Sequence, residues 1–227
     1  MTERTLIIGN KNYSSWSMRP WLLMKQANWS FNEIRIPLMT DEMPALMAQY
    51  SASRKVPVLK TEGSKEDGQQ GQEIEIWDSL AICEYINECC EGQFWPEDSN
   101  LRAMGRSAVS EMHSGFFALR AELPMNMRKT FSGFTPSDAA QKEIDRISNL
   151  WQQLLTASGG PWLLGEFSIA DAFYAPVVSR FITYQVDLPE ACQAYCQQVE
   201  QLEAYQEWKA AACDEAEVIA VAEIDQD

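Results

Sequence analysis

Histidine is almost absent from this chain, and cysteine is absent from its first third. The 227 residues contain one histidine, His113, and six cysteines, of which Cys83 is the first. No two cysteines form a C-x-x-C pair, and no cysteine lies at zinc-ligand spacing from the histidine. The sequence therefore predicts no metal site, and a hydrolase triad would have to use His113. We expect reduced cysteines, half-buried on helices, which is typical of a cytoplasmic protein.

Basic residues and long apolar runs are also scarce. Lysine and arginine total 18 against 33 acidic residues, and the formal net charge is −15. This charge argues against nucleic acid and anionic membranes as partners, because phosphate contacts need a basic surface. No apolar run approaches the ~20 residues of a membrane helix, and the N-terminus has no signal-peptide pattern. We therefore expect a cytoplasmic protein that binds neither nucleic acid nor membranes.

Hydrophobic residues make up 46% of the chain, which is enough for a substantial core. Up to residue 92, periods typical of strands alternate with periods typical of helices. The predicted strands cover 5–8, 31–37, 55–59 and 73–77, and the predicted helices cover 17–27, 43–50 and 79–91. A loop at 62–72 joins the last two strands, which form a hairpin. The pattern predicts a mixed-sheet α/β domain over residues 1–92.

The rest of the chain reads as helical. An aperiodic, proline-containing stretch at 93–100 predicts a linker, and residues 101–227 predict an all-helical domain. A first helix is expected over 101–129. Two apparent capping boxes, Thr135–Asp138 and Ser168–Asp171, predict further helix starts. The acidic tail that begins at residue 214 contains apolar residues, so the sequence leaves open whether the tail packs.

A hydroxyl-rich turn joins the first strand to the first helix. Because proline is tolerated only in the first turn of a helix, Pro20 predicts that this helix begins within Trp16–Pro20. The hydroxyls of Ser14, Ser15 and Ser17 would then lie at its N-terminus, where the helix dipole favours a negative charge. A bound oxyanion, carboxylate or thiolate would be stabilised there. The alternative is that one of these serines only caps the helix.

Four short motifs carry a resemblance to a known family. They are Ser14-Ser15-Trp16-Ser17-Met18-Arg19, Lys55-Val56-Pro57-Val58-Leu59, Asp78-Ser79-Leu80-Ala81-Ile82 and Phe167-Ser168-Ile169-Ala170-Asp171. In this order, with these elements between them, they resemble the cytosolic glutathione transferases. The resemblance implies a thioredoxin-like βαβαββα domain followed by an all-helical domain. The first motif is most similar to that of the bacterial, serine-type, zeta-like members, which carry Ser-Ser-Cys-Ser.

The resemblance implies a site for glutathione. Ser14 matches the serine that donates to the glutathione sulfur, and Ser15 and Ser17 are the other candidates in the turn. Lowering a thiol pKa by about two units requires roughly 2.7 kcal/mol, which a hydroxyl and a helix N-terminus can supply together.

Two further motifs complete this expected site. Lys55 and Val56 lie where the family pairs its backbone with the peptide, and Pro57 is expected to follow a cis bond. Ser79 matches the residue that binds the γ-glutamyl carboxylate, and Asp78 would bind the α-amino group. The structural alternative for Asp78 and Ser79 is plain helix capping.

A second substrate is expected between the two domains, against the first helix of the second domain. Helical spacing predicts that Met112, Phe116 and Arg120 lie on nearly one side of that helix, with His113 beside them. Trp16 could reach the same pocket. The alternative is that the apolar residues only pack in the core.

These expectations favour a homodimeric glutathione transferase that adds the glutathione thiolate to a small electrophile. One alternative is a zeta-like isomerase of the maleylacetoacetate type that uses glutathione as a cofactor. Trp16 argues against it, because zeta members have at that position a cysteine that their isomerase activity needs. Another alternative is a non-catalytic glutathione-binding or regulatory protein of the same fold.

Overall fold

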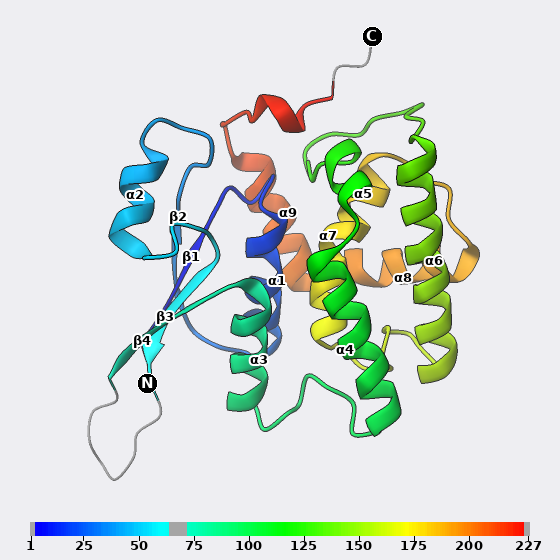
Figure 1. Cartoon of the computed structure of the whole chain (residues 1–227), viewed down its shortest axis with the longest axis horizontal. Helices are drawn as coiled ribbons and strands as arrows, with labels where there is room; N and C mark the ends of the chain where they lie inside the picture. Colours follow the sequence, from blue (N-terminus) through cyan, green and yellow to red (C-terminus); the bar gives the residue numbers. More distant parts are fainter. Residues whose placement is uncertain (1–2, 64–71, 225–227) are drawn as a thin grey trace.

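The first part of the chain folds as a four-stranded mixed sheet with three helices, as predicted. The computed structural model describes residues 3–63 and 72–224 (Figure 1). The strand order is β2-β1-β3-β4, with β2 parallel to β1, and β3 antiparallel to both β1 and β4. The elements of this part are β1 (Arg4–Ile8), α1 (Ser15–Gln26), β2 (Asn32–Arg35), α2 (Met43–Tyr50), β3 (Val58–Glu62), β4 (Glu73–Trp77) and α3 (Ser79–Cys89).

Alternation along the strands places helices on both faces of this sheet. Ile7 and Val58 pack with Met47 of α2 in a small cluster on one face. Leu6 and Ile8 belong to the main core on the other face, where Figure 1 shows α1 and α3. Because successive side chains of a strand point to opposite faces, one short apolar strand serves both layers.

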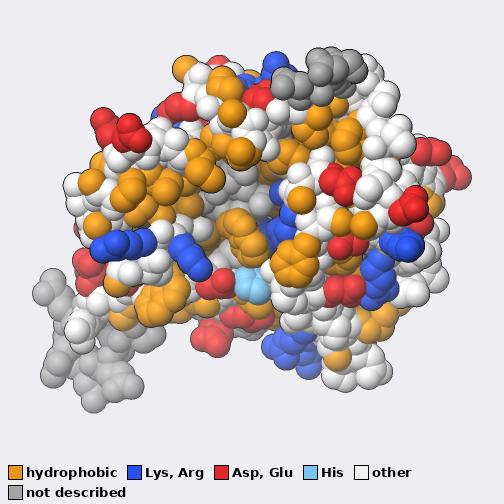
Figure 2. Space-filling model, turned by 45° about the horizontal axis from the view of Figure 1, so that its top comes forward, with side chains coloured by type: hydrophobic (Ala, Val, Ile, Leu, Met, Phe, Trp, Pro, Cys, Tyr) orange, Lys and Arg blue, Asp and Glu red, His pale blue; other side chains and the backbone are white. Residues whose placement is uncertain are grey.

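The second part is helical and shares its core with the first. It contains α4 (Ser99–Ser114), α5 (Phe117–Glu122), α6 (Asp138–Ser158), α7 (Ile169–Thr183), α8 (Glu190–Glu200), α9 (Glu203–Asp214) and a 3₁₀ turn at Ala220–Ala222. Helix α1 packs against α3, α7 and α9, so one hydrophobic cluster runs through both parts. Figure 2 shows the surface hollowed between the two parts, with hydrophobic side chains and cations at the hollow. The predicted fold class, a thioredoxin-like domain followed by an all-helical one, is confirmed.

Helix α1 begins one residue before the predicted window. Its first residue is Ser15, its cap is Ser14, and Pro20 lies inside the second turn. The prediction was wrong because it used Pro20 to place the first turn. The helix instead accepts this proline one turn later, where the Trp16 carbonyl loses the N–H donor it would have had and lies close to the proline ring.

The predicted helix over 101–129 is in fact two helices. Helix α4 ends at Ser114, and α5 starts after Phe116, which has the left-handed φ of 60°. A side chain at Gly115 would place its Cβ 2.9 Å from the Glu111 carbonyl oxygen, so this turn requires glycine. A period of apolar residues continues across the break, and this continuity misled the prediction.

Smaller differences occur at other boundaries. Strand β3 begins at Val58 rather than at residue 55, and the predicted linker at 93–100 runs into the start of α4. Helix α6 is capped by Ser137, whose hydroxyl accepts from the Ala140 N–H, so the expected capping box starting at Thr135 is wrong. Most of the loop predicted at 62–72 lies outside the described residues.

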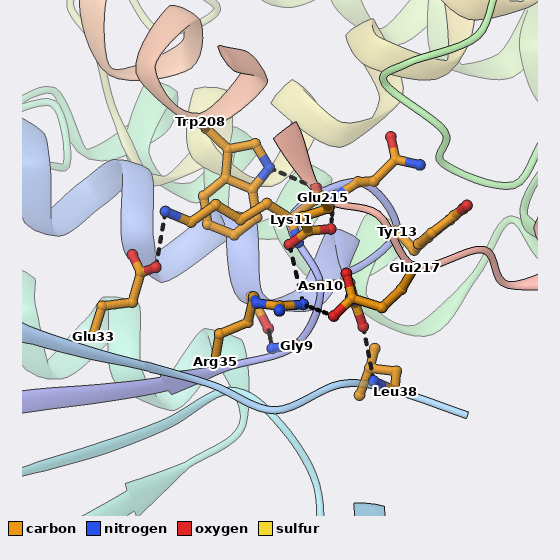
Figure 3. A network of polar contacts seen from close by, with 12 residues as sticks. Gly9, Asn10, Lys11, Tyr13, Glu33, Arg35, Leu38, Trp208, Glu215 and Glu217 are labelled. Atoms are coloured by element: carbon orange, nitrogen blue, oxygen red, sulfur yellow. Dashed lines mark hydrogen bonds and ion pairs between the residues drawn. The ribbon is translucent and has the colours of Figure 1, made fainter. Parts of the chain in front are cut away.

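The acidic tail packs, and it packs on the loop that precedes α1. We call residues 215–223 the C-terminal strap. The Glu215 carboxylate accepts hydrogen bonds from the backbone N–H groups of Lys11 (2.6 Å) and Asn12 (3.1 Å), and Figure 3 shows Glu215 beside Lys11. Glu217 forms an ion pair with Arg35 of β2 at 2.7 Å. The strap thus supplies hydrogen-bond acceptors that the loop lacks.

Arg128, from the segment between α5 and α6, also binds the C-terminal strap. Its guanidinium donates to the carbonyl oxygens of Glu215 and Glu217 and to the Tyr13 hydroxyl. Tyr13 in turn donates to the Glu223 carboxylate at 2.6 Å. These contacts join residues far apart in the sequence directly beside the hydroxyl-rich turn.

The Ser168–Asp171 capping box at the start of α7 is confirmed, but Asp171 does more than cap. Its buried carboxylate accepts hydrogen bonds from the N–H and hydroxyl of Ser168, from the Leu163 N–H and from the Tyr195 hydroxyl. Burial raises the pKa of Asp171 to about 6, and these hydrogen bonds oppose that rise. Asp171 therefore connects three segments of the helical domain.

Because Asp171 accepts hydrogen bonds from three segments and Ser168 only caps α7, replacing each with alanine should have unequal effects on stability. We expect Asp171→Ala to lower the free energy of unfolding by about 3 kcal/mol or more, because buried donors from three segments lose their acceptor. Ser168→Ala should cost about 1 kcal/mol, the usual value of an N-cap. Urea denaturation followed by circular dichroism measures both, and equal losses would contradict the wider role of Asp171.

A second pair of substitutions tests the C-terminal strap. We expect Glu215→Ala to cost about 2–3 kcal/mol of unfolding free energy, because it leaves the buried N–H groups of Lys11 and Asn12 without their acceptor. The matched control is Glu217→Ala, which removes only a partly exposed ion pair and should cost less than about 1 kcal/mol. The same denaturation measurement compares them, and a Glu215→Ala protein as stable as the control would show that the strap is dispensable.

Candidate functional site

A cavity of about 700 Å³ lies where α1, the segment before β3 and the start of α3 meet. The predicted site residues that line it come from all three places. They are Trp16, Lys55, Val56, Pro57, Asp78 and Ser79. The other predicted residues are not among its lining, and they divide into the remaining hydroxyls of the first turn and the residues of α4, α5 and the turn between them.

The start of α3 presents an unpaired hydroxyl to this cavity. Asp78 caps the helix, because its Oδ1 accepts a hydrogen bond from the Leu80 N–H at 2.8 Å. Ser79 is 1% exposed, and its hydroxyl has no hydrogen-bond partner among the described residues. A buried hydroxyl without a partner is costly, and a helix N-terminus favours an anion. This corner can therefore bind a carboxylate.

The segment before β3 presents an unpaired stretch of backbone. The peptide between Val56 and Pro57 is cis, as the family resemblance implies. In the described part of the chain, the N–H and C=O of Val56 form no hydrogen bond, because the ladder of β3 begins only at Val58. An extended peptide can pair with such backbone groups as an added strand would.

The hydroxyls of the first turn are already partly engaged. The Ser14 hydroxyl donates to the Ser17 hydroxyl oxygen at 2.7 Å, and that oxygen also accepts from the Gly9 N–H at 3.1 Å. Ser14 also caps α1 by accepting from the Ser17 N–H. Ser15 differs from both, since its hydroxyl forms no hydrogen bond within the described residues. The capping alternative therefore describes Ser14 in this conformation, and Ser15 retains a donor for a ligand.

Two of the expected second-substrate residues lie in the hydrophobic core, and two lie at the boundary between the two parts. Met112 is fully buried and Phe116 nearly so, and both belong to the main hydrophobic cluster. Because α4 ends at Ser114, the prediction that Met112, Phe116 and Arg120 share one helix face was wrong. The alternative of core packing holds for the two apolar residues.

His113 and Arg120 instead reach the Trp16 ring across the boundary between the two parts. The His113 ring meets it edge-on at 5.3 Å between centroids, and the Arg120 guanidinium lies 5.0 Å from the ring centroid. His113 Nε2 also lies 3.3 Å from Asp78 Oδ2. Trp16 and Asp78 both line the cavity, so these contacts connect the helical domain to its wall.

Half of the cavity lining was not predicted from the sequence. These residues are Leu38, Met43, Met47, Ser53, Arg54 and Trp77. Most are apolar and carry no local signal, because only the folding of the chain around α2 brings them here. Arg54 had a signal: two adjacent cations, Arg54 and Lys55, precede Val56 in a chain that is otherwise strongly acidic.

No group of three or more histidine, cysteine or acidic side chains among the described residues is arranged to hold a metal ion. Among the helices of the same residues, none has the length and apolar content that a transmembrane span requires.

Comparison with solved structures identifies known proteins that have the same fold. A glutathione transferase homologue from Burkholderia, solved with bound glutathione, superposes with a TM-score of 0.66 at 20% identity, covering 95% of this chain and 100% of that one. Glutathione transferase Omega 2S from Trametes versicolor gives a TM-score of 0.70 at 16% identity, covering 98% of this chain and 100% of that one. At these identities the likeness establishes the fold.

Sequence comparison identifies the family. The chain is 26% identical over 148 residues to glutathione S-transferase L1 of Arabidopsis thaliana, covering 64% of this chain and 54% of that protein. The chain thus spans about half the length of this curated relative. Residues 13–89 match the family described as glutathione S-transferase, N-terminal domain, and residues 134–210 match its C-terminal domain. These two matches span about two thirds of the chain in the family's own order, and the chain therefore belongs to the glutathione S-transferase family.

Proposed function

We propose that this protein is a glutathione transferase that binds glutathione in the 700 Å³ cavity and adds its thiolate to a small electrophile. One observation carries the proposal: the unpaired Val56 backbone and the unpaired Ser79 hydroxyl line the same cavity. Glutathione offers matching groups, since it has a peptide backbone and a γ-glutamyl carboxylate. Arg54 and Lys55 add two cations to the same lining, suited to a carboxylate of the tripeptide.

The proposed chemistry is activation of the thiol by the first turn of α1. The sulfur loses its proton to solvent, and the resulting thiolate is held by a hydroxyl and by the helix N-terminus. Ser15 is the proposed donor, because the Ser14 and Ser17 hydroxyls are bonded to each other. Ser14, which the family resemblance favours, becomes the donor only if its hydroxyl turns away from Ser17.

Two other functions make different use of the same cavity. A zeta-like isomerase would need the cysteine that Trp16 replaces, and no cysteine precedes Cys83, so this reading has little support from the residues. A non-catalytic glutathione-binding protein would use the Val56 and Ser79 contacts without activating the thiol. Turnover of an electrophile separates this second reading from a transferase. We further propose that the protein is cytoplasmic and forms a homodimer, and sedimentation equilibrium checks the dimer.

The first prediction of the proposed function concerns the contribution of Ser79 to glutathione binding. Ser79→Ala should weaken glutathione binding about tenfold, the usual effect of losing one hydrogen bond to a charged group. Isothermal titration calorimetry measures the dissociation constant. The matched control is Ser110→Ala on the exposed side of α4, which should bind like the unmodified protein. Failure of the unmodified protein to bind glutathione would refute the proposed function.

The second prediction concerns chemistry and separates the two serines. Ser15→Ala should raise the pKa of bound glutathione by about two units and lower turnover of chlorodinitrobenzene about 100-fold at neutral pH. Ser14→Ala should mainly cost stability, about 1 kcal/mol as for other caps. Ultraviolet absorbance of the thiolate against pH gives the pKa. The reverse pattern would assign the donor to Ser14, and glutathione binding without any turnover would favour the non-catalytic reading.

A further inference from the structure

Arg19 carries a positive charge that is buried and has no polar partner. Its side chain is 0% exposed, and its three guanidinium nitrogens have no hydrogen-bond partner among the described residues. The guanidinium lies against two aromatic rings, 4.3 Å from the Trp16 centroid and 4.5 Å from the Phe173 centroid. Burial, together with the charges of Arg120 and Arg180, lowers its pKa well below the usual value. Aromatic faces offset only part of the cost of such a buried charge.

Arg120 adds a second cation to the same place. Its guanidinium lies 5.0 Å from the Trp16 centroid, and it donates to the carbonyl oxygens of Gly115 and Met112 at the end of α4. Although the chain has 33 acidic residues, no carboxylate in the described ranges forms an ion pair with Arg19 or Arg120. This boundary therefore holds two arginines that lack a direct ion-pair partner among the described residues, and the carboxylates that act on them through space are Asp78 on Arg19 and Glu143 on Arg120.

Five residues in mutual contact form a cluster, which we call the arginine–aromatic wall: Trp16, His113 and Arg120 are partly exposed, and Arg19 and Phe173 lie buried behind them. They come from α1, α4, α5 and α7, and the His113 ring contacts both Trp16 and Phe173. The wall borders the proposed glutathione cavity, because Trp16 lines that cavity and His113 reaches the cavity residue Asp78. In Figure 2 the pale blue histidine lies in the hollow between the two parts, with acidic side chains next to it and hydrophobic and basic side chains nearby.

We propose that the arginine–aromatic wall binds the second substrate, and that this substrate is a planar aromatic electrophile bearing a carboxylate. The inference rests on the proposed function and names its substrate class. The partly exposed rings of Trp16 and His113 match a planar acceptor, and Arg120, which is also only partly buried, meets its carboxylate. Arg19 supplies a second positive charge behind the Trp16 ring, in a setting of low dielectric where charges act strongly.

The reaction follows from these positions. With an aryl chloride as acceptor, the glutathione sulfur, already deprotonated, forms a bond to the ring carbon that carries chlorine. The carbon–chlorine bond then breaks, and chloride leaves with its electron pair. No oxidant or reductant is needed, and the wall's role is to hold the acceptor's anionic end away from the incoming thiolate.

The test uses two acceptors that differ only in charge. Chloronitrobenzoate is anionic, and the matching chloronitrobenzamide is neutral with nearly the same shape. After correction for the uncatalysed rates, kcat/KM of the unmodified protein should favour the benzoate about tenfold or more. Arg120→Met should reduce this preference about tenfold, and Arg120→Lys should retain part of it. The control Arg146→Met removes an exposed arginine of α6 that pairs with Glu111, and should leave the preference unchanged.

Binding of the acceptor is measured separately from turnover. A failure of this inference can then be told apart from a failure of the proposed function. Calorimetry with nitrobenzoate and nitrobenzamide, in the presence of unreactive S-methylglutathione, should show the same preference for the anion. If neither aryl chloride reacts but nitrobenzoate is preferred, the wall is supported and the transferase activity is not. Equal affinity for the two compounds, or an equal loss of preference in Arg146→Met, would overturn the inference. Thermal melting and circular dichroism check that Arg120→Met is folded.

Discussion

The burial of α1 is the constraint on which the rest of the structure depends. Nine of its twelve residues are buried, and the helix packs against α3, α7 and α9. A helix enclosed in this way must satisfy its free N–H groups without water, and the Ser14 hydroxyl does so by accepting from the Ser17 N–H. The Ser17 hydroxyl in turn accepts from the Gly9 N–H of the preceding loop. The same enclosure brings the first turn to the boundary of the two parts. The position at which a thiolate would be held and the surface that an acceptor would meet are therefore set by one helix.

Charge is distributed unevenly over this framework. The acidic residues outnumber the basic ones, yet arginines concentrate around α1, where Arg19 and Arg180 are buried and Arg120 partly so. Burial lowers the pKa of Arg180 to about 9, while carbonyl oxygens of Pro176 and Leu123 accept its hydrogen bonds. Arg19 lacks such acceptors. An acidic exterior with a cationic interior boundary favours small anions over large polyanions, since only small ligands reach the interior charge.

Local patterns allowed most of the fold to be predicted from the sequence. Alternation in the strands, the Asp78 cap and the Ser168–Asp171 box each depend on residues within a few positions, so a single sequence contains them. The break at Gly115 was missed because apolar spacing continues through it. The contact of His113 with Asp78 could not be predicted, since it joins two elements through the tertiary fold. Ser14 was favoured because it matches the serine of the family resemblance, and its bond to Ser17, three positions away, depends on side-chain rotamers that residue spacing does not specify.

The C-terminal strap has a consequence for how this chain is made. The loop before α1 obtains acceptors for its Lys11 and Asn12 amides from Glu215, about two hundred positions later. During synthesis the β-sheet can assemble early, but this loop remains incomplete until the ribosome has released the strap. An excised N-terminal domain, grafted onto a different helical partner, would carry the same deficit unless that partner brought a carboxylate to the same two amides.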